Sequence, residues 1–380
     1  MIILSPQKSL SWFVSILIYL KQGGSCVRTN WGAAFQIAAV YVGTVVGAGF
    51  ATGREIVEFF SRFGFIGLIG ILMSGYLLIF MGSKLMRIAA HIGASSYEQF
   101  NEYLFGKKIG KLINFIMLFM LLGVCAVMLS GAGAVFQEQL GISKNTGILI
   151  TIALSILVMI VGIKGLFAVN SFVVPMMIVF SLILFYFSIK LPGFVDQALF
   201  IPSSQEGWKS VVAPFTYTAF NLSLAQAVLV PVAAEIKDDQ TVKWGGILGG
   251  IALTLILLMG HFTLIMLPGL ESYEIPMATI MKSLAPGLYG IFILIIYGEI
   301  FTSVIGNIFG LERQIKKYVS VPSIMIVIGI FVVCYLVSQF DYSTLLSYLY
   351  PLFGNISLIF IVLLWMKPFK PNSGGTKNNK

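Results

Sequence analysis

Charge is scarce in this 380-residue chain: only 10% of its residues are Asp, Glu, Lys or Arg, whereas 58% are hydrophobic. A soluble domain typically carries about 25% charged residues, because its surface has to be hydrated. The composition therefore excludes a water-soluble globular protein. It is typical of a chain in a lipid bilayer, whose hydrocarbon core of about 30 Å is crossed by roughly 20 apolar residues per helix.

Cysteine and histidine are also rare, with three of the first and two of the second. Cys26, Cys125 and Cys334 are widely spaced and two of them lie in apolar runs, so they predict neither a disulfide framework nor a metal site. The sequence has no His-Glu-x-x-His, phosphate-binding glycine loop or Gly-x-Ser-x-Gly motif. We therefore expect no enzyme, no cofactor and no ATP-driven pump.

Ten apolar runs account for most of the chain. Alternating strands of about ten residues are absent, so the sequence predicts an all-α membrane protein with about ten transmembrane helices. An apolar run in residues 10–20 is too short to cross, so residues 1–30 are expected to be an N-terminal extension outside the core. The predicted spans are residues 31–62, 64–90, 111–137, 146–164, 167–190, 211–235, 244–268, 288–312, 320–338 and 345–366.

Basic residues are distributed unevenly among the predicted loops. If the segment before Trp31 is cytoplasmic, 18 of the 24 Lys and Arg residues lie on the cytoplasmic side. This bias predicts a multi-pass protein of the inner (cytoplasmic) membrane with both termini in the cytoplasm. Because the net charge of +9 is explained by these loops, we expect no nucleic-acid partner, only the bilayer and a small-molecule substrate.

The two halves of the chain resemble each other when one is shifted by 176 residues. The Ser-Tyr-Glu tripeptide of residues 96–98 then falls on that of residues 272–274, and Pro175 falls on Pro351. Because five spans per half is an odd number, the second half must enter the membrane from the opposite side, which predicts a 5+5 inverted repeat. The expected parts are a first repeat (31–190), an external connection (191–210), a second repeat (211–366) and a cytoplasmic tail (367–380).

Glycines interrupt the first span near its middle, where residues 42–49 read Val-Gly-Thr-Val-Val-Gly-Ala-Gly. Since glycine weakens a helix, we expect the backbone to unwind there and to leave N–H and C=O groups free for a ligand. The alternative is close helix packing through glycines at i and i+4.

The matching segment of the sixth span, residues 214–226, is polar at the same depth. Asn221, Ser223 and Gln226 are costly in lipid unless they face a cavity or free backbone groups. We therefore predict that helices one and six are both broken, the second near residues 220–224, around a midplane site. The alternative is that these side chains bond neighbouring helices together.

A carboxylate and two hydroxyls share one face of the eighth span, because Glu299, Thr302 and Ser303 stand at i, i+3 and i+4. Oxygen ligands suit a hard cation such as sodium, and a buried carboxylate can also carry a proton. We expect a coupling site here, with a structural hydrogen bond as the alternative.

The other charged residues of the spans are interpreted as structural. Arg54, Glu55 and Glu58 are expected to anchor the outer end of the first span, in preference to forming a gate with Asp341. His261 is expected to be satisfied by a neighbour.

Two short motifs make a resemblance specific. Residues 31–35 (Trp-Gly-Ala-Ala-Phe) and 49–55 (Gly-Phe-Ala-Thr-Gly-Arg-Glu) resemble the YkvI-type bacterial membrane proteins, which are placed in the amino-acid/polyamine/organocation (APC) superfamily. The glycine-rich first span, the polar sixth span and Thr302-Ser303 look like the broken helices and sodium site of leucine-transporter-type (LeuT-fold) carriers.

The resemblance implies a sodium site and a substrate site. The sodium ligands would be the carbonyls of Gly43 and Val46 with the hydroxyls of Thr302 and Ser303. The substrate contacts would come from both breaks and the eighth span: Gly47, Ala48, Gly49, Phe220, Asn221, Leu222, Ser223 and Asn307.

The chain also departs from the LeuT-fold pattern. Phe50 stands where relatives with a second sodium carry Asn, so a second sodium site is not expected. Residues 167–189 lack the lysine that proton-coupled relatives can place near the sodium position, which favours sodium.

These features predict a secondary active transporter, a sodium-coupled symporter of a small amino acid or related zwitterion that works by alternating access. Sodium would be its coupling ion. Two alternatives remain open: a proton-coupled carrier that uses Glu299, and a membrane solute receptor on the same fold that does not transport.

Overall fold

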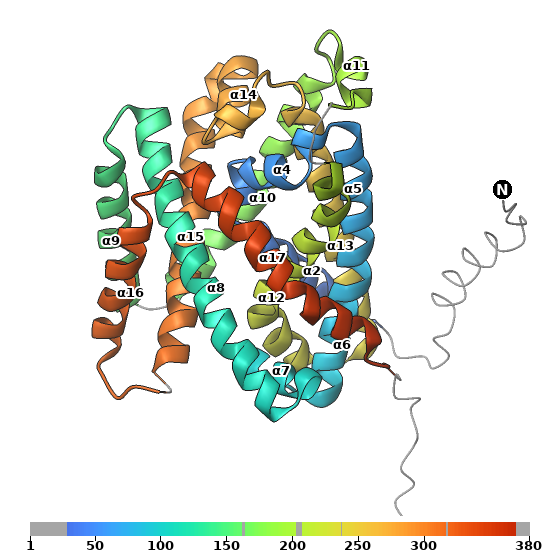
Figure 1. Cartoon of the computed structure of the whole chain (residues 1–380), viewed down its shortest axis with the longest axis vertical. Coiled ribbons are helices and arrows are strands. Elements are labelled where there is room, and N and C mark those ends of the chain that lie inside the picture. Colours follow the sequence, from blue (N-terminus) through green and yellow to red (C-terminus); the bar gives the residue numbers. More distant parts are fainter. Residues whose placement is uncertain (1–28, 162–163, 203–206, 237, 317, 370–380) are drawn as a thin grey trace, which may run out of the picture.

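The computed structural model describes residues 29–161, 164–202, 207–236, 238–316 and 318–369, without the side chains of residues 160–174. The predicted N-terminal extension and most of the predicted tail lie outside these described residues. Within them, the chain forms helices and no strands (Figure 1). The all-α prediction is therefore confirmed.

The helices of the first half follow the predicted spans closely. The first span is made of α2 (Trp31–Val45), α3 (Ala48–Ala51) and α4 (Arg54–Phe59), and the second of α5 (Phe65–Leu77), the π-helix η2 (Leu78–Gly82) and α6 (Ser83–Ile92). They are followed by α7 (Tyr97–Phe105), α8 (Lys107–Ala134) with the π-helix η3 (Val135–Gln139), α9 (Lys144–Val161) and α10 (Lys164–Ser188).

The second half begins after the short helix α11 (Phe194–Leu199). Its helices are α12 (Gly207–Ile236), α13 (Asp239–Leu264), α14 (Pro276–Leu284), α15 (Tyr289–Ile315), α16 (Ser323–Val337) and α17 (Tyr342–Met366). The short 3-10 helix η4 (Leu270–Ser272) precedes α14.

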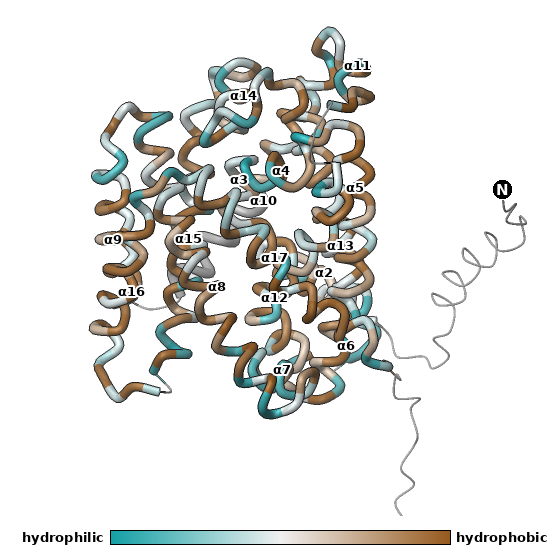
Figure 2. The backbone as a smooth tube through the Cα atoms, in the orientation of Figure 1, coloured by the Kyte–Doolittle hydropathy of each residue, from teal (hydrophilic) through white to brown (hydrophobic). Residues whose placement is uncertain are grey.

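Among the described residues, six helical segments are long and apolar enough to cross a membrane: Phe65–Ile92, Lys107–Gln139, Gly207–Ile236, Asp239–Leu264, Pro286–Ile315 and Tyr342–Met366. Four shorter apolar helices accompany them, in α2, α9, α10 and α16. Figure 2 shows hydrophobic colour along the middle of the helices and hydrophilic colour mainly near the two ends of the bundle. This distribution is what a bilayer requires of a lipid-facing surface.

The two ends of the bundle are each marked by a short amphipathic helix, α7 at one end and α14 at the other (Figure 1). We call them the α7 end and the α14 end. The described chain begins and finishes at the α7 end, because the Asn30 backbone N–H donates to Thr241 at the start of α13 and the Lys367 ammonium donates to the Tyr103 carbonyl of α7.

The first span is broken as predicted. Helix α2 ends at Val45. The next two residues, Val46 and Gly47, are extended, and helix α3 begins at Ala48. A second interruption follows at Gly53, whose φ of 81° is in the left-handed region that favours glycine. The first span is therefore three short helices in series.

The prediction of a break in the sixth span is wrong, because α12 is one continuous helix over Gly207–Ile236. The reason lies in its residues. The segment 214–226 contains no glycine, and its polar side chains bond to the helix itself: Thr218 donates to the Pro214 carbonyl and Asn221 to the Tyr217 carbonyl. The polar groups of Thr218 and Asn221, which suggested an unwound backbone, are thus bonded within the helix.

Candidate functional site

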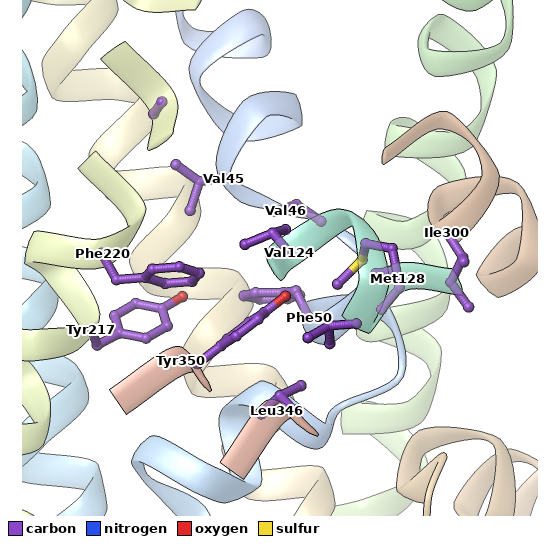
Figure 3. Packing of buried hydrophobic residues seen from close by; sticks show 14 of the residues in the cluster. Val45, Val46, Phe50, Val124, Met128, Tyr217, Phe220, Ile300, Leu346 and Tyr350 are labelled. Carbon is purple, nitrogen blue, oxygen red and sulfur yellow. The ribbon is translucent and has the colours of Figure 1, made fainter. Parts of the chain in front are cut away.

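The break in the first span lies at the centre of the bundle, where α2 and α3 meet α8, α12, α15 and α17. Figure 3 shows apolar side chains from these elements around it, among them Val46 and Phe50 from the break, Met128 of α8 and Ile300 of α15. These residues are buried. The break is therefore enclosed by the bundle.

The break lies against α15, the helix of the eighth span that carries Glu299, Thr302 and Ser303. A Cβ atom added to Gly47 would lie 3.5 Å from Oγ of Ser303, so this hydroxyl lies directly against the extended backbone. Thr302 is buried, and its hydroxyl donates to the Glu299 carbonyl at 3.2 Å. The structure thus brings Ser303 against the break, whereas the hydroxyl of Thr302 bonds within its own helix.

The end of α2 supplies unbonded carbonyls beside this stripe. Val46 donates its N–H to the Val42 carbonyl, and none of the described hydrogen bonds uses the carbonyls of Gly43 or Val46. Free C=O groups at a helix end, next to two hydroxyls, are ligands of the kind that a sodium ion prefers. The four sodium ligands of the prediction therefore lie on two neighbouring segments.

The predicted substrate residues are only partly brought together. Phe220 is buried, and its ring lies 4.5 Å from that of Tyr350 on α17. Because α12 stays helical, Asn221 and Ser223 point about 160° apart, to nearly opposite sides of its axis, so they cannot line one pocket. Ala48 and Leu222 are fully buried in the core, and Asn307 is half-buried one turn beyond Ser303.

Glu55 occupies the centre of the site, where the sequence interpretation did not place it. Its Oε1 accepts a hydrogen bond of 3.2 Å from Asn221 Nδ2, at the middle of α12. A Cβ atom added to Gly49 would lie 2.6 Å from its Oε2, so the carboxylate fills the space that the missing side chain leaves. The expectation that Glu55 anchors the outer end of the span is therefore wrong, since Gly53 turns α4 back and aims Glu55 inward.

The signal for this residue was present in the sequence. Glu55 follows Gly49 and Gly53 in the same motif, and glycines at such positions allow both a tight turn and a close approach. The sequence interpretation included the break at residues 47–49 but no turn at Gly53, so it placed Glu55 near the outer end of the span.

Hydrogen bonds tie the first span to the loops and helices of the α14 end. Arg54 Nη1 donates to the carbonyls of Glu271 (2.6 Å) and Tyr273 (3.2 Å), in the segment before α14. Ser347 of α17 donates to Glu58 at 2.8 Å. This end of the bundle is therefore closed by contacts among α4, α14 and α17.

Asp341 does not take part in that closure. It pairs with Lys144 at 3.9 Å, and its side chain is 76% exposed. Glu58 instead pairs with Arg62 at 3.0 Å. A gate between the acids of the first span and Asp341 is thus not formed.

A small cavity lies on the other side of α12, between α8 and α17. Its volume is about 20 Å³, close to the minimum that holds one water molecule. Ser223 Oγ and Gln226 Oε1 are buried at this site without a hydrogen-bond partner, although Gln226 Nε2 contacts Met117 Sδ at 3.0 Å. The lining residues are Ile113, Ile116, Met117, Met120, Ser223, Gln226, Ile356, Ser357 and Phe360.

The structure shows the surroundings of two further polar residues of the membrane region, Glu299 and His261. Glu299 is buried, and its Oε1 has no hydrogen-bond partner. His261 has the neighbouring partner that was predicted, since its Nδ1 lies 3.1 Å from Ser61 Oγ, but its Nε2 is buried without a hydrogen-bond partner. Among the described residues, no group of three or more His, Cys, Asp or Glu side chains converges on a metal position.

Comparisons with known proteins agree with this architecture. A family model described as spore germination protein matches residues 33–344. The uncharacterized membrane protein YkvI of Bacillus subtilis (strain 168) is 49% identical over 336 residues, 88% of this chain and 96% of that protein. The uncharacterized protein YyaD of the same organism is 25% identical over 342 residues, 89% of this chain and 98% of that protein.

Solved structures of transporters share the fold. A mutant of the manganese transporter of Eremococcus coleocola superposes with a TM-score of 0.60 at 14% identity, covering 90% of this chain and 80% of that chain. The inward facing conformation of Mhp1 superposes with a TM-score of 0.56 at 13% identity, covering 87% and 75%. At these identities the likeness extends to the fold alone.

Proposed function

Because this chain belongs to the spore germination protein (spore permease) family, we propose that it is a secondary transporter that carries a small solute across a membrane by alternating access. The observation that supports this most is the broken first span, whose extended residues Val46 and Gly47 lie against Ser303 in a fold shared with transporters. A family of permeases and a transporter fold also argue against an enzyme.

The proposed architecture is a 5+5 inverted repeat of ten spans. Corresponding helices keep a nearly constant spacing, since α2 and α12 begin at Trp31 and Gly207 and α10 and α17 begin at Lys164 and Tyr342. Helix α7 begins within the first Ser-Tyr-Glu segment and α14 follows the second, and the two helices lie at opposite ends of the bundle (Figure 1). Opposite ends are what an inverted repeat requires.

Sodium is the proposed coupling ion, held by the carbonyls of Gly43 and Val46 and the hydroxyls of Thr302 and Ser303. These groups are supported by the 3.5 Å approach of Ser303 to the break and by the unbonded carbonyls of α2. A sodium ion there would hold α2 against α15. Sodium should therefore raise solute affinity, typically by about 5- to 150-fold for a coupling of ordinary strength.

The experiment is uptake of a mixture of radiolabelled amino acids into proteoliposomes under separate sodium and proton gradients. We expect sodium-driven uptake that is lost when Thr302→Val and Ser303→Ala are combined, because the change removes two ligands and little volume. Glu299→Gln should alter sodium affinity without abolishing uptake. Uptake that ignores sodium, survives the double variant and disappears in Glu299→Gln would replace sodium by proton coupling through Glu299.

A solute receptor on the same fold is the second candidate. It is favoured by the apolar filling around the break and by the hydrogen bonds that close the α14 end. A receptor would bind its solute in purified form but show neither uptake nor counterflow, so the same proteoliposomes separate the two functions.

A further inference from the structure

We propose that Glu55 binds the ammonium group of the solute, which makes amine-bearing compounds the substrate class of this protein. This inference deepens the proposed transport function, because it assigns a ligand to the central site. It starts from a carboxylate that is only 3% exposed and lies between the first span and the middle of α12.

The carboxylate lacks a cationic partner. Asn221 Nδ2 is its hydrogen-bond donor, and none of the ion pairs among the described residues includes Glu55. Glu58 and Glu312, two other buried acids of the first and eighth spans, have such partners in Arg62 and Lys316. Among the described residues, Glu299 of the eighth span is also buried without an ion pair. A buried carboxylate is expensive unless a cation or a proton neutralises it, so this position favours a positively charged ligand.

Two glycines allow the second carboxylate oxygen of Glu55, Oε2, to lie next to the first turn of α3. Gly49 carries no Cβ, and an added one would lie 2.6 Å from Oε2 and 3.2 Å from Cβ of Glu55. The left-handed turn at Gly53 sets the direction of α4. The acid therefore reaches the region that the resemblance assigned to the solute.

Aromatic residues lie close to the same carboxylate. Tyr217 and Phe220 stand within about one turn of Asn221, the donor to Glu55, and the Phe220 ring lies 4.5 Å from that of Tyr350. All three aromatic residues are buried. The hydroxyl of Tyr217 has no hydrogen-bond partner. Figure 3 shows Tyr217, Phe220 and Tyr350 close together on one side of the break. An acid beside aromatic faces is a suitable environment for an ammonium group, which binds both.

The arrangement also separates amine recognition from the sodium ligands. Glu55 lies beside Gly49, whereas Ser303 lies beside Gly47, two residues earlier and just before α3. A solute with one ammonium group can therefore bind Glu55 without displacing the proposed cation.

The test is binding to the purified full-length chain, read as thermal stabilisation over a concentration series. Two matched sets of probes are used: leucine, 3-methylbutylamine and 4-methylpentanoate, and alanine, ethylamine and propanoate. In each set the second compound lacks the carboxylate and the third lacks the amine. We expect stabilisation by an amine-bearing member of at least one set and none by the two acids.

The variants are Glu55→Gln, which removes the charge, and Gly49→Ala, which displaces the carboxylate by steric contact. Either change should weaken amine binding by about tenfold to a hundredfold, the range for losing one charged hydrogen bond. Glu312→Gln is the matched control, because Glu312 is a buried acid near the opposite end of α15 that already has Lys316 as its partner. It should leave the Kd unchanged. If Glu55→Gln does not fold, Gly49→Ala alone decides.

The inference fails if no amine-bearing probe stabilises the protein, if Kd changes less than about twofold in both variants, or if Glu312→Gln weakens binding equally. Intact amine binding in Glu55→Gln, combined with loss of uptake driven by a proton gradient, would make Glu55 a proton site instead. Amine binding that depends on Glu55 but is never followed by uptake would sink the transport proposal and leave this inference standing.

Discussion

Single residues decide the geometry of the first span. Gly53 has a φ of 81°, and an added Cβ would lie 2.6 Å from Cγ of Met277 and 3.2 Å from Leu264. Gly93 has a similar φ of 64° but no neighbouring atom within 4 Å. Substitution of Gly93 therefore tests the cost of the left-handed backbone alone, whereas substitution of Gly53 adds the cost of a steric clash.

We predict that Gly53→Ala destabilises the protein more than Gly93→Ala. Both variants place a side chain in the left-handed region, which costs about 1–3 kcal/mol, but only Gly53→Ala also meets packed atoms. The measurement is the Tm of each variant in the same detergent. Equal losses of Tm would mean that the side chain of Met277 can move away from an alanine at position 53, so that this contact adds no cost.

At the scale of elements, the broken span carries contacts that a continuous helix could not make. Helix α4 leaves the axis of α2, so Arg54 reaches the carbonyls of Glu271 and Tyr273 before α14. Met277 at the start of α14 returns a hydrogen bond of 3.0 Å to the Thr52 carbonyl. The first span and residues 271–277 are thus linked in both directions, by the side chain of Arg54 and by the backbone N–H of Met277.

Arg54→Gln should loosen this α14 end. The shorter amide cannot span both carbonyls, so the population of molecules open at that end should rise. The readout is the labelling rate of a cysteine at position 347, placed in a background without the three native cysteines, by a membrane-impermeant thiol reagent. Arg313→Gln, near the α7 end, is the control. An unchanged labelling rate in Arg54→Gln would show that these two bonds do not hold the end shut.

At the scale of the whole molecule, the described chain enters and leaves the bundle at the α7 end (Figure 1). From the distribution of basic residues, we propose that this end is cytoplasmic.

We therefore predict that a reporter fused after the C-terminal residue is active only if it is a cytoplasmic reporter, and that a reporter inserted after Gly193 is active only if it is an external one. Gly193 lies next to α11, which Figure 1 places near the α14 end. Fusions with the opposite pattern would reverse the orientation and with it the side from which Arg54 closes the site.

The sequence by itself was sufficient for the large features. Hydropathy predicted the helical class and the approximate limits of each span, because a bilayer imposes one length and one surface chemistry on every segment that crosses it. The glycines of residues 43–49 likewise predicted the break in the first span, since weakness of the helix is a local property.

Only the tertiary structure decided which polar residues meet. Asn221 was expected to mark a second break, yet its amide bonds within a continuous α12 and to Glu55. Glu55 was assigned to the membrane interface, because the sequence does not show that Gly53 redirects α4 towards the centre. Whether a polar side chain in a membrane helix unwinds the backbone, bonds to its own helix or reaches a neighbour depends on the partners that packing brings within hydrogen-bond distance.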